Sequence, residues 1–227
     1  CQTQKENTHI HLEYVSANPT GPLHVGHGRS AAYGASLANV LTALGYQVHR
    51  EYYINDAGRQ MQILAFSVWV RYLQALSEDI CLPANAYQGQ YIIDIANNLL
   101  ETKGDSFSTT KQAYIDALGT QYCPETAPDS YIDHAISTVK QVIGDAAFLD
   151  VKQFSLDAIL EDIQTDLEAF GVHYDSWFPE SQLYDNGSFE QGIALLKEQG
   201  HVYEKDGATW FRATDLGDEK DRVLIRE

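Results

Sequence analysis

The chain has 227 residues, of which 44% are hydrophobic, and a formal net charge of −17 at pH 7. A chain of this length and apolar content can bury a core as one or two domains. The excess of acidic residues argues against a nucleic-acid-binding surface on this chain, because contacts to a phosphate backbone need clustered Lys and Arg. No apolar run approaches the roughly 18 residues that cross a membrane, and no signal peptide opens the chain, so we expect no membrane partner.

The cysteines and the chain ends indicate the setting of the protein. Cys1, Cys81 and Cys123 show no C-x-x-C pair, which predicts reduced thiols and a cytoplasmic location. The chain opens on a cysteine, and its only methionine is Met61. We therefore expect an internal piece of a longer protein.

The N-terminal stretch predicts a strand, a loop and a helix in that order. Apolar residues favour a strand over residues 9–15, and the prolines and glycine within residues 18–22 end it in a loop. A helix over residues 24–44 follows. His24 and His27 lie three residues apart at the start of this helix, where both can face one ligand.

This arrangement suits a phosphoryl group. The helix start offers backbone N–H groups and the positive end of the helix dipole, and the imidazoles of His24 and His27 add further donors. Gly26 has no side chain, so a flat ring or a phosphate can approach the backbone. Neither G-x-G-x-x-G nor G-x-x-x-x-G-K-[ST] is present, so dinucleotide and P-loop chemistry are not indicated. Two alternatives stay open: surface histidines that cap an ordinary helix, and a metal pair, for which no third ligand lies at suitable spacing.

A second strand is predicted over residues 47–54. We expect it to pair in parallel with the first strand through a right-handed crossover, which places residues 21–27 at the carboxyl edge of the sheet. Asn55 and Asp56 are then expected to cap a long helix over residues 58–76.

The remainder of the chain predicts more helices and a hairpin. Helices are predicted over residues 87–103, 109–118, 129–143, 155–170 and 188–199. Ser155 is expected to begin the fourth of these helices. Asp206 and Gly207 predict a tight turn that joins strands over residues 201–205 and 209–213. Residues 222–226 predict a last strand, with no partner after it.

Several blocks of the sequence resemble one enzyme family. The stretch S-A-N-P-T-G-P-L-H-V-G-H-G-R-S, residues 16–30, resembles the HIGH signature of class I aminoacyl-tRNA synthetases, written here His24-Val25-Gly26-His27. Residues 13–19, 50–60 and 210–226 are similar to the arginyl-tRNA synthetases in particular. Members of that family are more than twice as long as this chain. The resemblance therefore implies an internal fragment that covers the first part of the catalytic domain.

The resemblance implies an α/β fold with a Rossmann-like parallel sheet, a mainly helical insertion and a small β-hairpin region. Residues 1–77 would form the first half of the Rossmann-like catalytic domain, which carries the HIGH-type motif. Residues 78–150 would form the helical insertion. Residues 151–227 would add a helix and a hairpin of the catalytic or insertion region, truncated at the C-terminus.

The resemblance also implies an activity, arginine–tRNA ligation. Such an enzyme activates arginine with ATP to arginyl-adenylate and then transfers the arginyl group to tRNA(Arg). On this implication His24 and His27 are the catalytic residues, and together with Gly26 they bind ATP. Mg²⁺ would accompany the ATP, with no protein ligand identifiable and no metal site made by the protein.

The arginine itself would be held by residues that precede the histidines. Ser16, Ala17, Asn18 and His27 match positions that bind the amino acid in the family, and Glu13 matches a carboxylate that faces the guanidinium. The expected partners are L-arginine and, through the full-length protein, tRNA(Arg). We expect a cytoplasmic monomer, and a fragment that is not active alone.

Three alternatives remain open. The first is a nucleotidyltransferase that uses the same H-x-G-H site without tRNA, the second a sister synthetase for another amino acid, and the third a non-catalytic binding module made from such a domain. The predicted arginine-binding residues argue against the sister synthetase. His173, Asp175 and Ser176 do not predict a catalytic triad, because residues so close in sequence rarely converge and no nucleophile elbow is present.

Overall fold

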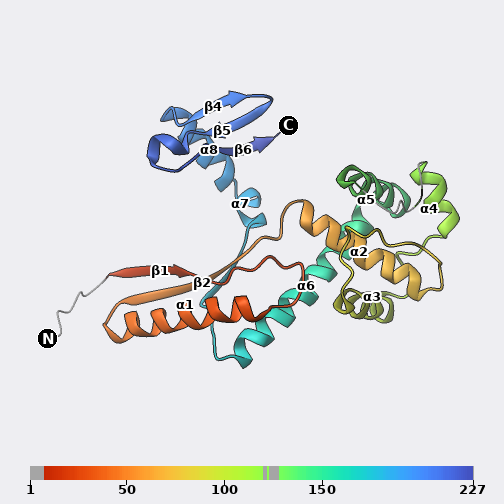
Figure 1. The fold of residues 1–227 in the computed structure, drawn as a ribbon, viewed down its shortest axis with the longest axis horizontal. Coiled ribbons are helices and arrows are strands. Elements are labelled where there is room, and N and C mark those ends of the chain that lie inside the picture. Colours follow the sequence, from red (N-terminus) through yellow and green to blue (C-terminus); the bar gives the residue numbers. More distant parts are fainter. Residues whose placement is uncertain (1–7, 120–121, 123–127, 227) are drawn as a thin grey trace. The chain divides into compact units, whose positions relative to one another are not determined.

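The computed structural model describes residues 8–119, 122 and 128–226. The chain forms two compact units, Cys1–Phe178 and Pro179–Glu227, and each is described by itself. The expected α/β class is confirmed, since a sheet with a parallel strand pair and several helices make up the first unit (Figure 1). The division at residues 77 and 150 stays a prediction.

The sheet of the first unit has the strand order β1-β2-β3, with β1 at His9–Glu13, β2 at Gln47–Ile54 and β3 at Ser176–Pro179. The pair β1 and β2 is parallel, in register from His9 opposite Gln47 to Glu13 opposite Glu51. Helix α1, Val25–Ala43, makes the crossover between them. The predicted parallel pairing is therefore confirmed, and the loop that carries the predicted site leaves β1 at the carboxyl edge.

Helix α1 can pack closely because its inner face is made of small residues. Ala31, Gly34 and Ala38 are its buried residues. A Cβ atom on Gly34 would lie 2.2 Å from Cγ of Tyr14, so the tyrosine ring occupies the space that a side chain would take. Gly45, with φ of +90°, follows the C-cap residue Leu44 and ends the helix.

Replacing Tyr14 by phenylalanine is expected either to leave the free energy of unfolding unchanged or to increase it, by at most about 3 kcal/mol. The Tyr14 side chain is buried, and its hydroxyl has no hydrogen-bond partner among the described residues. An unpaired buried hydroxyl is destabilising, and phenylalanine removes it. Tyr72→Phe is the matched control, because the Tyr72 hydroxyl donates to the Gly104 carbonyl at 2.7 Å and its loss should destabilise. Urea unfolding measures both variants, and a clearly destabilised Tyr14→Phe protein would contradict the expectation.

The helical part of the first unit is built around α2, Arg59–Ala75, which is buried along most of its length. It packs against α3, Gln90–Lys103, against α5, Asp129–Ile143, and against the long helix α6, Asp145–Ala169. Helix α4, Lys111–Leu118, packs against α5. In Figure 1 these helices gather at one end of the unit, and α6 runs back from them toward the sheet.

Two helix starts differ from the sequence-based prediction. Ser155 does not begin a helix: α6 begins ten residues earlier, at Asp145, and the buried Ser155 hydroxyl donates to the Val151 carbonyl at 2.7 Å. Here a serine binds the preceding turn, an alternative to capping. The N-cap of α2 is Gly58, without a side-chain cap, and not Asn55 or Asp56.

The second unit combines two α-helices with a small antiparallel sheet. Its elements are α7 (Ser181–Asp185), α8 (Ser188–Glu198), β4 (Val202–Lys205), β5 (Ala208–Phe211), the short 3-10 helix η1 (Ala213–Leu216) and β6 (Arg222–Arg226). Asp206 and Gly207 have φ of +52° and +71° and join β4 to β5, which confirms the predicted hairpin. The expectation of an unpartnered last strand is wrong, because β6 pairs with β5, which precedes it.

Two further expectations concern the setting of the protein. Within the described part of the chain, no helix combines the length and apolar character needed to span a membrane. Cys81 is disulfide-bonded, so the expectation of a reduced thiol is wrong at this position.

Candidate active site

The two signature histidines form one stacked unit at the start of α1. His24 is the N-cap residue, with extended backbone (φ −128°, ψ 172°). Its Nδ1 accepts a hydrogen bond from the Gly26 N–H at 3.1 Å, and Nδ1 of His27 accepts from the His24 N–H at 3.2 Å. The ring centroids are 3.7 Å apart with an interplanar angle of 18°. The two side chains thus make a reciprocal capping box.

This capping decides which ring nitrogens can act on a ligand. Because both Nδ1 atoms are hydrogen-bond acceptors, each neutral imidazole carries its proton on Nε2. The pKa of His27 is lowered, first by burial and then by the neighbouring His24 ring, which favours the neutral form at pH 7. The pair therefore presents two Nε2–H donors, a donor set that suits phosphate oxygens.

The helix start is less open than the sequence suggested. The Gly26 N–H is bound to the His24 ring, and the N–H groups of His27 and Gly28 reach the His24 carbonyl at 2.9 and 3.2 Å. The expectation of free backbone N–H groups is wrong for these residues. Capping by the histidines, one of the alternatives left open, is present, and it leaves the Nε2 atoms for a ligand.

Gly26 has a steric role that the sequence did not reveal. A Cβ atom on Gly26 would lie 2.9 Å from Cε1 and 3.0 Å from Nδ1 of His24. The next glycine, Gly28, has nothing within 4 Å of its Cβ position. The missing side chain at Gly26 therefore makes room for the His24 ring in its capping position.

The chain makes a strained turn directly after β1. The Ser16 N–H donates to the Tyr14 carbonyl at 3.1 Å, which closes a three-residue turn centred on Val15. Val15 and Ser16 have φ of +67° and +40°. A positive φ is rare for a β-branched residue, and such conformations store about 1–3 kcal/mol each and cluster at functional sites.

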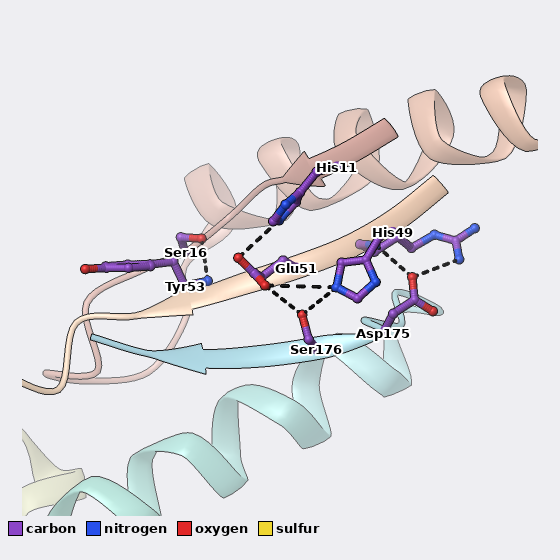
Figure 2. A network of polar contacts seen from close by, with 8 residues as sticks. His11, Ser16, His49, Glu51, Tyr53, Asp175 and Ser176 are labelled. Carbon is purple, nitrogen blue, oxygen red and sulfur yellow. Dashed lines mark hydrogen bonds and ion pairs between the residues drawn. The ribbon is translucent and has the colours of Figure 1, made fainter. Parts of the chain in front are cut away.

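The end of β2 anchors the residues that follow this turn. Ser16 Oγ accepts from the Tyr53 N–H at 3.0 Å, as Figure 2 shows. The Tyr52 hydroxyl donates to the Ala17 carbonyl at 3.1 Å, and Nδ2 of Asn55 donates to Oδ1 of Asn18 at 3.3 Å. These three predicted arginine-binding residues, Ser16, Ala17 and Asn18, are thus brought together on one support.

The predicted guanidinium partner, Glu13, lies exposed at the end of β1. It is in register with Glu51, so both carboxylates project from the same face of the sheet. Glu51 accepts from Ser176 Oγ at 2.9 Å and lies 3.1 Å from Nε2 of His11 (Figure 2). The Glu13 side chain makes no hydrogen bond or ion pair with another described residue, so its carboxylate can meet a cation.

No catalytic triad forms from His173, Asp175 and Ser176. His173 is exposed, and Asp175 accepts from the Arg50 N–H at 2.7 Å. Ser176 Oγ lies 2.9 Å from Nε2 of His49 (Figure 2). The Glu51 carboxylate lies 4.0 Å from that same Nε2 atom. It therefore does not orient the ring through Nδ1, as the carboxylate of a triad does. Across the described ranges, no group of three or more His, Cys, Asp or Glu side chains could hold a metal ion.

The sequence analysis missed most of the residues that support the site. Tyr52, Tyr53 and Asn55 lie in the block of residues 50–60, which resembles the synthetases; of these three, only Asn55 has a role predicted from the sequence, that of a helix cap. Tyr91 of α3 and Tyr174, just before β3, also bind the loop through their hydroxyls. Nothing in their local sequence indicates these contacts.

Comparison with known proteins identifies the family. The family model described as tRNA synthetases class I (R), catalytic domain, matches residues 1–227. An arginine–tRNA ligase of Coxiella burnetii (strain RSA 331 / Henzerling II) is 57% identical over 218 residues, which make up 96% of this chain and 37% of that protein. An arginine–tRNA ligase of Legionella pneumophila (strain Corby) is 51% identical over 225 residues, 99% of this chain and 38% of that protein.

Solved structures agree with this result. A Campylobacter jejuni protein described as an arginyl-tRNA synthetase superposes with a TM-score of 0.75 at 32% identity, over 98% of this chain and 42% of that one. Arginyl-tRNA synthetase of Thermus thermophilus gives a TM-score of 0.58 at 22% identity, over 97% and 33% of the two chains, and supports the fold alone. The chain thus spans less than half the length of these relatives. Since the family model matches it from end to end, the chain belongs to the class I tRNA synthetases for arginine and forms part of their catalytic domain.

Proposed function

We propose that a full-length protein carrying this chain is an arginine–tRNA ligase. It activates arginine with ATP and transfers the arginyl group to tRNA(Arg). The observation that carries the proposal is the stacked pair of His24 and His27, whose Nε2–H donors are set by the capping box. The curated relatives of Coxiella and Legionella, both arginine–tRNA ligases, support the choice of amino acid and of tRNA.

In the first step, a carboxylate oxygen of arginine attacks the α-phosphorus of ATP. The new bond between this oxygen and phosphorus forms as the bond from phosphorus to the bridging oxygen of the β-phosphate breaks, and pyrophosphate leaves. His24 and His27 donate from Nε2 to phosphate oxygens as negative charge develops on them. Mg²⁺ would accompany the ATP and neutralise phosphate charge, with no protein ligand identified for it among the described residues.

Arginine is held by the loop that precedes the histidines. Ser16 and Asn18 bind its α-amino and carboxylate groups beside the backbone of Ala17, with His27 nearby. Glu13 pairs with the guanidinium, whose planar set of donors matches a carboxylate. In the second step, a ribose hydroxyl of the terminal adenosine of tRNA(Arg) attacks the carbonyl carbon of the adenylate and AMP leaves.

The proposal also covers the oligomeric state of the protein and its location in the cell. The enzyme acts in the cytoplasm, where arginine, ATP and tRNA meet, and it acts as a monomer. Light scattering of the full-length protein measures its mass in solution. A dimer mass would contradict this part of the proposal and leave the activity untouched.

The test is ATP–pyrophosphate exchange with each of the twenty amino acids, performed with the full-length protein in the presence and absence of tRNA. Among the twenty amino acids, we expect only arginine to drive exchange. Exchange driven by another amino acid would show a sister synthetase, and exchange driven by a substrate that is not an amino acid would show a different nucleotidyltransferase. Binding of ATP without any exchange would show a non-catalytic module. Each of these three outcomes overturns the proposal.

A further inference from the structure

We propose that Tyr52, Tyr91 and Tyr174 form a tyrosine clamp that fixes the backbone of residues 14–20 and thereby positions the arginine-binding side chains of Ser16 and Asn18. The inference rests on the proposed function. The three tyrosines are positioning residues, because they contact the loop and not the reacting atoms.

The three hydroxyls of the clamp bind every third backbone carbonyl of the loop, those of residues 14, 17 and 20. The Tyr174 hydroxyl donates to the Tyr14 carbonyl at 2.9 Å, and the Tyr52 hydroxyl donates to the Ala17 carbonyl at 3.1 Å. The Tyr91 hydroxyl donates to the Thr20 carbonyl at 2.7 Å. The donors come from the segment before β3, from β2 and from α3, so three separate parts of the first unit converge on one loop.

The loop's own backbone supplies only part of this support: the Ser16 N–H binds the Tyr14 carbonyl at 3.1 Å, and the Thr20 N–H binds the Asn18 carbonyl at 2.8 Å. Residues 14–20 lie outside helices and strands, so no regular ladder binds their carbonyls. Val15 and Ser16 also hold positive φ angles that an unsupported chain would leave. The two predicted arginine-binding side chains lie between the bound carbonyls: Ser16 between those of residues 14 and 17, and Asn18 between those of residues 17 and 20.

The donors of the clamp are themselves held in place. The Tyr174 ring packs against Tyr14 at 4.8 Å between centroids, and Trp177 stacks on Tyr52 at 4.4 Å. The Tyr91 side chain lies between two glycines. A Cβ atom on Gly21 would lie 3.1 Å from the Tyr91 hydroxyl, and a Cβ atom on Gly89 would lie 2.3 Å from the Tyr91 ring. Rings fixed in this way aim their hydroxyls at single acceptors.

The hydroxyls also stay protonated and can donate. Burial raises the pKa of Tyr52 to about 12, although its bond to the Ala17 carbonyl acts in the opposite direction. Burial likewise raises the pKa of Tyr91 and of Tyr174. The clamp therefore does not open through ionisation of these groups near neutral pH.

The experiment replaces each clamp tyrosine by phenylalanine in the full-length protein. Phenylalanine keeps the ring packing and removes one hydrogen bond. We expect each single variant to raise KM for arginine about 2- to 10-fold, the equivalent of one lost hydrogen bond, with a smaller change in kcat. Hydrogen exchange should become faster in peptides that cover residues 14–20.

Tyr72→Phe is the matched control. Its hydroxyl also donates to a backbone carbonyl, that of Gly104 at 2.7 Å, but outside the loop. This variant should lose stability and keep the KM for arginine and the exchange rates of the loop. Unchanged KM and loop exchange in all three clamp variants, or an equal rise of KM in Tyr72→Phe, would overturn the clamp.

The two proposals fail in different ways. If the full-length protein does not catalyse exchange with arginine, the proposed function fails, whereas hydrogen exchange of residues 14–20 still decides whether the hydroxyls hold the loop. If exchange with arginine is present and the clamp variants match the parent in KM, only the clamp is wrong.

Discussion

Replacing either His24 or His27 by alanine in the full-length protein is expected to slow adenylate formation about 10²–10³-fold. Each imidazole supplies one Nε2–H donor to a phosphate on which charge develops, and a donor of this kind contributes mainly in the transition state. The affinity for arginine should change much less. ATP–pyrophosphate exchange gives the rate, and calorimetry gives the binding constant of arginine.

The capping bonds of His24 need a control of their own, because alanine removes both the cap and the donor. Asparagine at position 24 keeps a side-chain oxygen that can cap the helix, since it is among the preferred N-cap residues. We expect His24→Asn to retain the stability that His24→Ala loses, about 0.5–2 kcal/mol, and to remain as slow in adenylate formation. A folded alanine variant that activates arginine within about threefold of the parent would remove that histidine from the mechanism.

Replacing Gly34 by alanine is expected to lower the free energy of unfolding by about 1–3 kcal/mol. The new Cβ would lie 2.2 Å from Cγ and 2.3 Å from Cδ2 of Tyr14. Because Tyr14 also packs on Tyr174, its ring has little room to move, and α1 must shift away from the sheet. Urea unfolding measures the loss, and a drop in exchange activity should accompany it because His24 begins the same helix.

Gly28 provides the matched substitution on the same helix. Its Cβ position has nothing within 4 Å, so alanine there meets no neighbour. Alanine favours a helix over glycine by up to about 1 kcal/mol, and Gly28→Ala should therefore be neutral or stabilising. If Gly34→Ala were as stable as Gly28→Ala, the close contact between α1 and Tyr14 would not limit packing.

Local patterns in the sequence were sufficient wherever a short-range rule decides the structure. Residues 47–54 and 129–143 were predicted with the bounds that β2 and α5 have. The turn at Asp206 and Gly207 followed from the preference of such a dipeptide for positive φ. His24 and His27 could be assigned to one site because residues three apart on a helix turn lie on the same face.

Short-range rules failed where packing or pairing elsewhere in the fold decided the outcome. Ser155 has the residue type of a helix cap, yet α6 extends past it because Phe148 and Val151 continue its buried face. Asn55 has the type of a cap as well, and it binds Asn18 instead. The last strand, β6, pairs with β5, which precedes it in the sequence. A strand at the end of the chain therefore needs no later segment to pair with.

The support of the candidate site could be seen only in the folded chain. Tyr91 and Tyr174 bind carbonyls 71 and 160 residues away in sequence, and no hydrophobic period or motif reports such a contact. The positive φ of Val15 goes against the preference of a β-branched residue, and its neighbours Tyr14 and Ser16 are bound by Tyr174 and Tyr53 from outside the turn. Periodicity and capping act within a few residues, so the sequence alone located the histidines and the elements that carry them. The pairing of each hydroxyl with its carbonyl depends on where separate elements meet, and only the tertiary structure decides that.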